Sequence, residues 1–113
     1  MEQYIKNIEH GAAIGFASLV QYASGQVVSR TLAQNDHVSL TLFAFDKGEE
    51  ISSHASDGDA LVVALEGEGR VTIDGQPHRL DAGASIVMPA KTPHAVYATE
   101  QFKMFLVVVF PEA

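Results

Sequence analysis

Turn signals recur about every ten residues along most of the chain, and this spacing limits the fold more than any other feature. The signals are glycines, a proline and Asn or Asp pairs, and they fall at Gly25, Asn35-Asp36, Gly48, Asp57-Gly58, Gly67 to Gly69, Asp74-Gly75, Gly83 and Pro93. Segments of this length hold short strands and leave little room for helices. The sequence therefore predicts an all-β sandwich or barrel.

Between the turn signals lie segments rich in β-forming residues. They cover residues 27–32, 38–45, 61–66, 70–73, 85–88, 94–99 and 104–110. The pair Asp74-Gly75 suits a type I′ turn, so residues 70–80 are expected to form a β-hairpin. Pro77 cannot donate a hydrogen bond to a neighbouring strand, which predicts that it lies on an edge strand.

The first 24 residues differ from the rest. Phe16, Leu19 and Val20 fit one face of a helix, but nearby glycines disfavour a long one. We expect an N-terminal arm at residues 1–24 with one helical turn, followed by a barrel core at about residues 38–110. With 113 residues and 47% hydrophobic content, the chain is the size of a single domain, which we expect to span residues 1–113.

Composition excludes several classes of function. The chain has no cysteine, so it forms neither a disulfide nor a thiolate metal site. Its formal charge of −7 repels a phosphate backbone, so no nucleic-acid partner is expected. The longest apolar run, residues 104–110, is far shorter than the roughly 20 residues that span a bilayer. The first ten residues lack a signal-peptide core, which predicts a cytoplasmic protein that does not contact membranes.

Two segments, residues 48–67 and 83–95, resemble the two sequence motifs of the cupin superfamily. The first motif is a glycine, five residues, His-x-His, three or four residues, a glutamate, six residues and a glycine. The second is a glycine, five residues, Pro-x-Gly, two residues and a histidine. The positions that match are Gly48, His54, Gly67, Gly83, Pro89 and His94. The resemblance implies an antiparallel jelly-roll β-barrel with a pocket at one mouth.

The resemblance also implies a metal site that is only partly retained. In the family, two histidines and a glutamate of the first motif and one histidine of the second hold a metal. Here Ser56, Ala60 and Lys91 replace the second histidine, the glutamate and the second-motif glycine. We expect His54 and His94 to hold a divalent metal (Zn, Fe, Ni or Mn) weakly, because imidazole suits such ions but catalytic sites usually have three protein ligands. No organic cofactor is expected.

The missing ligands have three possible sources: water, a chelating substrate such as a carboxylate or oxo acid, or another histidine, for which His78 is the candidate. Residues two apart in a strand share a face, so we expect Ser56 to lie beside His54 in the pocket. The other expected pocket-lining residues are Ala60, Val62, Met88 and Phe45.

Two functions agree with these observations. The first is a small cupin-type barrel protein that binds a divalent metal weakly, a small polar or anionic ligand, or both. Whether it is an enzyme stays open, since similar barrels include dioxygenases, isomerases and decarboxylases. The alternative is a metal-free small-molecule binding or sensing module. We also expect a homodimer, because residues 38–45 and 104–110 are hydrophobic on both faces and the arm has no obvious place on a lone barrel.

Overall fold

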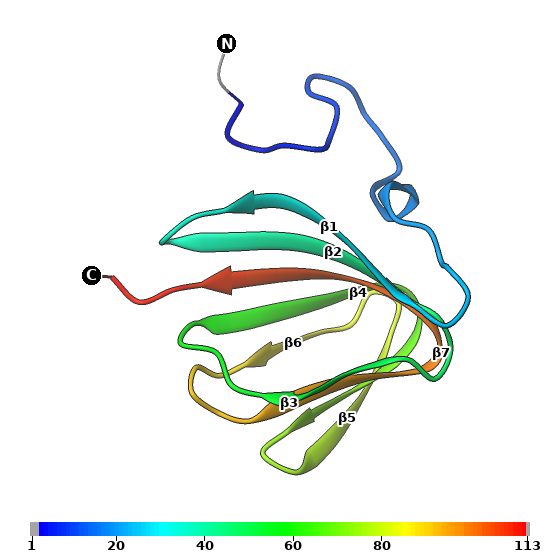
Figure 1. Ribbon diagram of the computed structural model, residues 1–113, viewed down its shortest axis with the longest axis vertical. Coiled ribbons are helices and arrows are strands. Elements are labelled where there is room, and N and C mark those ends of the chain that lie inside the picture. The colour runs from blue at the N-terminus through cyan, green and yellow to red at the C-terminus, as the bar shows by residue number, and fades with distance from the viewer. Residues whose placement is uncertain (1–2, 113) are drawn as a thin grey trace.

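The computed structural model describes residues 3–112 and contains seven strands and one short 3-10 helix (Figure 1). The elements in chain order are η1 (Phe16–Leu19), β1 (Val27–Gln34), β2 (Val38–Phe45), β3 (Glu50–His54), β4 (Asp59–Ile73), β5 (Gln76–Asp81), β6 (Ser85–Met88) and β7 (His94–Val109). All strand pairs are antiparallel, and the jelly-roll β-barrel with a short N-terminal arm is confirmed. Within residues 3–112, no helix has the length and apolarity to cross a lipid bilayer.

The two long strands, β4 and β7, pass through both layers of the barrel (Figure 1). The first half of β4 pairs with the second half of β7, and this layer also contains β1, β2 and β6. The second half of β4 pairs with the first half of β7, and here β3 and β5 flank them. A cavity lies between the two layers.

The predicted turn at residues 67–69 is wrong, because β4 continues through it. Gly67 has φ 77°, and a Cβ atom there would overlap the backbone carbonyl oxygen of Gln101 on β7. Gly69 lies under the ring of Phe102 and has no room for a side chain. These glycines therefore mark a bulge where two strands approach closely and bend from one layer into the other. The predicted strands at 94–99 and 104–110 are likewise one strand, β7.

The β4–β5 hairpin agrees with the prediction. Asp74 and Gly75 both have positive φ, 48° and 82°, as a type I′ turn requires. Pro77 lies on β5, at the edge of the sheet, where its missing N–H costs no ladder hydrogen bond. β3 is not among the predicted strands, because its sequence EISSH is mostly polar and lacks a hydrophobic pattern. Its pairing with β7 defines it.

The main core fills the space between the layers. Its largest fully buried side chains are Phe45, Phe102, Met104, Val62, Val71 and Val96. The rings of Phe45 and Phe102 lie 5.9 Å apart. These residues come from β2, β4 and β7, so the long strands supply most of the interior.

A second core lies on the outer face of the sheet, beneath the N-terminal arm. Leu42 and Ala44 of β2 are fully buried there, and the ring of Phe16 packs edge-on against Phe105 at 4.9 Å. Figure 1 shows the arm running along this outer side before the chain enters β1. We expected a partner subunit to cover the outer face of residues 104–110, but at Phe105 the chain's own arm covers it.

Lys103 of β7 anchors the N-terminal arm to the sheet. Its side chain is buried, and its Nζ donates a hydrogen bond to the Ala17 carbonyl oxygen at 2.9 Å. The same ammonium lies 3.7 Å from a carboxylate oxygen of Glu66 and 5.0 Å from the centre of the Tyr22 ring. The Tyr22 hydroxyl donates to the same carboxylate. The buried charge is thus balanced by an anion, a carbonyl and an aromatic face, as a buried ammonium requires.

Candidate metal and ligand site in the barrel cavity

A cavity of about 340 Å³ opens between the two layers of the barrel. It is lined by Phe43, Ile51, His54, Ala55, Ser56, Ala60, Met88, His94, Val96, Met104, Leu106 and Val108. Its volume lies near the lower end of the range typical of small-molecule sites. Both histidines that the sequence singled out lie in this cavity.

The two histidines face each other across neighbouring strands. His54 ends β3, His94 begins β7, and the two residues are directly paired in the sheet. Their Nε2 atoms lie 3.2 Å apart, and the rings meet at 74° with centroids 4.4 Å apart. His94 is buried, whereas His54 is exposed at the rim.

The other nitrogen of each ring is occupied by a backbone carbonyl. Nδ1 of His54 lies 2.9 Å from the Ser52 oxygen, and Nδ1 of His94 lies 3.1 Å from the Thr92 oxygen. A carbonyl oxygen only accepts hydrogen bonds, so each Nδ1 carries the proton. In the neutral rings both Nε2 atoms therefore present lone pairs. Two lone pairs 3.2 Å apart repel each other unless a shared proton, a hydrogen-bond donor or a metal ion lies between them.

Burial lowers the pKa of His94 below its usual value, and the neighbouring His54 lowers it further. The hydrogen bond with the Thr92 carbonyl opposes these effects without cancelling them. Burial disfavours the charged imidazolium because it removes water from around it. His94 is consequently neutral at neutral pH, with its Nε2 lone pair available to a ligand.

The geometry fits two ligands of one metal ion. Nitrogens about 2.0–2.1 Å from a metal, at an angle between 90° and tetrahedral, lie about 2.9–3.4 Å apart. The Nε2 separation of 3.2 Å falls in this range. Histidine ligands also commonly donate their second N–H to a backbone carbonyl, as both rings do here. Among residues 3–112, no group of three or more His, Cys, Asp or Glu side chains is placed to hold a metal, so a metal at this pair would take its remaining ligands from water or a bound molecule.

Three further expected pocket residues line the cavity: Ser56, Ala60 and Met88. Ser56 lies in the loop beyond the end of β3, so strand alternation does not position it, and its Oγ accepts a hydrogen bond from the Gly58 N–H at 3.2 Å. Ala60 pairs with Met88 between β4 and β6, and both are almost fully buried. The methionine therefore lies beside the position where the family has its glutamate.

The structure places the other three candidates outside the cavity wall. Phe45 is fully buried at its contact with Phe102, and Val62 is fully buried in the core between its partners on β6 and β7. Neighbouring side chains thus separate both from the open space. His78 is exposed on the edge strand β5, opposite Val71, and does not join the histidine pair.

Most of the apolar wall was not predicted. Val96, Met104, Leu106 and Val108 all come from β7, and Ile51 comes from β3. The even-numbered residues of β7 share the inner face, a signal that the alternation of a single long strand contains. The sequence hides this alternation, because every residue from Met104 to Phe110 is hydrophobic and the outward-facing positions are as apolar as the inward-facing ones.

Two charged residues near the cavity have structural roles. The Asp59 carboxylate accepts a hydrogen bond from the Ala90 N–H at 2.8 Å. Lys91 replaces the glycine of the second motif and keeps the left-handed backbone that glycine favours, with φ 61°. Its backbone N–H donates to the Ser56 carbonyl oxygen at 2.7 Å, which ties the loops of the two motifs together.

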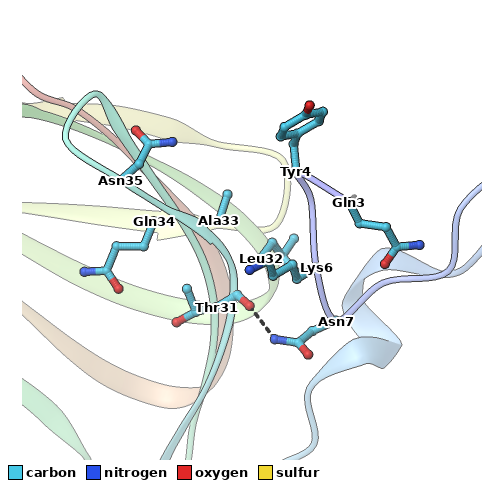
Figure 2. A pocket seen from close by; sticks show the side chains of 9 residues that line it. All are labelled: Gln3, Tyr4, Lys6, Asn7, Thr31, Leu32, Ala33, Gln34 and Asn35. Carbon is cyan, nitrogen blue, oxygen red and sulfur yellow. Dashed lines mark hydrogen bonds between the residues drawn. The ribbon is translucent and has the colours of Figure 1, made fainter. Parts of the chain in front are cut away.

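A second hollow lies between the N-terminal arm and β1 (Figure 2). The arm is held there by the Lys6 N–H, which donates to the Leu32 carbonyl at 2.7 Å, and by the Asn7 amide, which donates to the Thr31 carbonyl at 2.8 Å. Figure 2 shows the side chains of Gln3 and Tyr4 turned away from β1. Among the described residues that line this hollow there is neither a histidine nor a carboxylate, so the barrel cavity is the better candidate site.

Comparisons with known proteins agree with this fold. A sequence profile described as the cupin domain matches residues 41–110. The crystal structure of a conserved protein of unknown function from Streptococcus pyogenes is 47% identical, with a TM-score of 0.96 over 99% of this chain and 98% of that one. A cupin superfamily protein from Desulfitobacterium hafniense is 34% identical, with a TM-score of 0.91 over 95% of this chain and 98% of that one.

A similar curated protein is the dimethylsulfoniopropionate lyase DddW from Ruegeria pomeroyi. It is 32% identical over 79 residues, which cover 66% of this chain and 52% of the lyase. The chain therefore spans about half the length of this relative.

Proposed function

The chain belongs to the cupin superfamily, and from this premise we propose that it binds a small molecule in its barrel cavity. The molecule binds at His54 and His94, together with a divalent metal that the same two residues hold. One observation carries the proposal: the Nε2 atoms of the two rings lie 3.2 Å apart, and the carbonyl partners of both Nδ1 atoms leave them as acceptors. Such a pair binds one cation or one donor group between its nitrogens.

His54 and His94 would supply two imidazole ligands, and Ser56 would face the same space with its hydroxyl. Imidazole suits zinc, iron and nickel better than manganese, so the donor set favours the first three of the expected metals. When bound, the metal would polarise an oxygen of the ligand. With two protein ligands the affinity is expected to be modest, and a chelating ligand would raise it by filling open positions.

The lyase relative supports a small carboxylate ligand. Its name describes an enzyme that acts on dimethylsulfoniopropionate, a small molecule with one carboxylate and one sulfonium cation. A carboxylate would bind through the metal, because both Nε2 atoms are acceptors and offer an anion no hydrogen bond of their own.

A second candidate function is a metal-free binding or sensing module. It is favoured by the donor set, since residues 3–112 place no third His, Cys, Asp or Glu beside the pair. In that case His54, His94 and Ser56 would bind the ligand through hydrogen bonds alone. A ligand that raises the melting temperature in the presence of a chelator would support this candidate.

The test is metal content, measured by mass spectrometry on untagged protein purified without chelator. We expect near-stoichiometric metal in the wild type and its loss in His54→Ala and His94→Ala. His78→Ala is the matched control, because this histidine is exposed and outside the cavity. Absence of metal in the wild type, even after addition of Mn, Fe, Ni or Zn, would refute the metal site and leave the metal-free module.

We also propose that residues 1–113 form one domain and that two copies pair. The arm completes the second core, which argues for a single unit.

The surface that would pair lies on the outer face of the sheet, next to the part that the arm covers. It carries Val87 and Val109, which are 51% and 55% exposed, beside the half-buried Val63 and Val107. Light scattering should give the mass of a dimer, and Val87→Lys with Val109→Lys should give a monomer. A monomeric wild type at micromolar concentration would contradict the pairing.

A further inference from the structure

The barrel cavity is apolar almost throughout. Nine of its twelve lining residues have hydrocarbon, aromatic or thioether side chains. The deepest wall includes Val96 and Met104, which are 2% and 1% exposed. These side chains offer a ligand no strong hydrogen-bond partner.

The few polar atoms lie together at one end. Only His54, Ser56 and His94 contribute polar side chains, and both Nδ1 atoms of the histidines are already bonded to carbonyls. What remains for a ligand is the two Nε2 atoms and the Ser56 hydroxyl. His54 is exposed, whereas His94, Val96 and Met104 are almost fully buried, so the histidine pair extends from the rim at His54 to the apolar interior at His94.

We infer that the ligand of this cavity is a small monocarboxylate with an apolar body, its head group at the histidine pair and its hydrocarbon part against the walls from β7, β2 and β6. The inference rests on the proposed binding at His54 and His94 and narrows the ligand from polar or anionic molecules in general. A second carboxylate or a row of hydroxyls would lose its water against Met104 and Leu106 without a partner in return. Each such group lowers affinity by about tenfold or more.

Size limits the ligand further. A volume of about 340 Å³ corresponds to roughly eleven water molecules at about 30 Å³ each. The apolar body therefore has the size of a short aliphatic chain or one aromatic ring. Long-chain fatty acids and disaccharides exceed this space.

The experiment compares three six-carbon acids by isothermal titration calorimetry against zinc-loaded and chelator-treated wild-type protein. Hexanoate has one carboxylate and an apolar chain. Gluconate keeps the carboxylate and adds hydroxyls along the chain, and adipate adds a second carboxylate at the far end. We expect hexanoate to bind at least about tenfold more tightly than the other two. Binding only to the zinc-loaded protein supports a carboxylate held through the metal, and equal binding to both forms would overturn this placement of the head group.

The inference is overturned if gluconate or adipate binds as tightly as hexanoate, or if a protein that binds zinc binds none of the three. Zinc binding is measured separately with His54→Ala and His94→Ala. A protein that holds zinc through the pair but prefers gluconate therefore refutes the ligand class alone. If neither variant alters zinc or hexanoate binding, the proposed function fails as well.

A cavity-wall variant tests the position of the apolar body. Leu106→Asn would place an amide on the cavity wall and should weaken hexanoate binding at least about tenfold. The ratio of hexanoate affinity to gluconate affinity should therefore fall. Val107→Asn is the matched control, because Val107 is the next residue on β7, does not line the cavity and has the opposite orientation. Val108→Thr, which nearly preserves volume, makes the same test if Leu106→Asn does not fold. Unchanged hexanoate binding in folded variants would overturn the inference.

Discussion

The Nε2 atoms of His54 and His94 lie 3.2 Å apart although the residues are 40 positions apart in the chain. The contact exists because β3 ends and β7 begins at the same point of the sheet. Each ring is oriented by the carbonyl two residues before it. Strand pairing and local backbone geometry together therefore produce the pair. Among the residues that line the cavity, only these two histidines carry basic nitrogen atoms.

Restoring the two ligands that the family motif has lost should strengthen metal binding. Ser56→His with Ala60→Glu would complete the set of three histidines and a glutamate. We expect zinc affinity to rise at least about a hundredfold, since changes even to outer-shell partners of metal sites alter affinity about 10–100-fold. Competition with a chromophoric chelator measures it. Ser53→His, which adds an exposed histidine outside the cavity, is the control, and an unchanged affinity in the double variant would contradict the site.

Gly67→Ala should be among the most destabilising single changes to a glycine. Its Cβ would meet the Gln101 carbonyl oxygen, and φ is 77°. The left-handed backbone alone costs about 1–2 kcal/mol for a non-glycine residue, and the overlap should raise the total to about 3 kcal/mol or more. Gly25→Ala separates the two causes, because φ is 67° there but nothing lies within 4 Å. Urea denaturation compares them, and equal losses would show that the close approach is unimportant.

Lys103→Ala should loosen the N-terminal arm. It removes the bond to the Ala17 carbonyl and the ion pair with Glu66, and we expect a loss of about 2 kcal/mol in the free energy of unfolding. Hydrogen exchange should accelerate in residues 16–22 before it does so in the barrel. Lys47→Ala is the control, because its ion pair with Glu100 is solvent-exposed and should contribute little. Unchanged exchange in the arm would refute this anchoring role.

The stability of the protein should fall at alkaline pH through Tyr22. Burial raises the pKa of its hydroxyl far above the usual value, and the hydrogen bond and the negative charge of Glu66 raise it further. A raised pKa in the folded state gives stability that is fully present below the unfolded value of about 10 and is lost as pH rises above it.

Urea denaturation between pH 7 and pH 11 tests this effect. Tyr22→Phe should be less stable at pH 7, because the bond to Glu66 is gone, but should lose less stability above pH 10 than the wild type. Tyr4→Phe is the control, because Tyr4 is 79% exposed and its pH profile should follow the wild type. Parallel profiles for the wild type and Tyr22→Phe would contradict the assignment.

Local features of the sequence determined the strand class, the hairpin at Asp74-Gly75 and the edge position of Pro77, because turn type and donor loss depend on a few adjacent residues. Motif spacing also selected His54 and His94 from five histidines. These two do line one cavity.

The tertiary structure alone decided the rest. Gly67 and Gly69 resemble a turn in sequence, and only the approach of Gln101 and Phe102 makes them a bulge within β4. The arm buries the outer face because its apolar residues meet β2 and β7, which no local pattern specifies. The apolar cavity and the facing Nε2 atoms likewise depend on which strands pair and in which register. Such contacts join residues far apart in the chain, and their energies are set by packing and desolvation in the folded molecule.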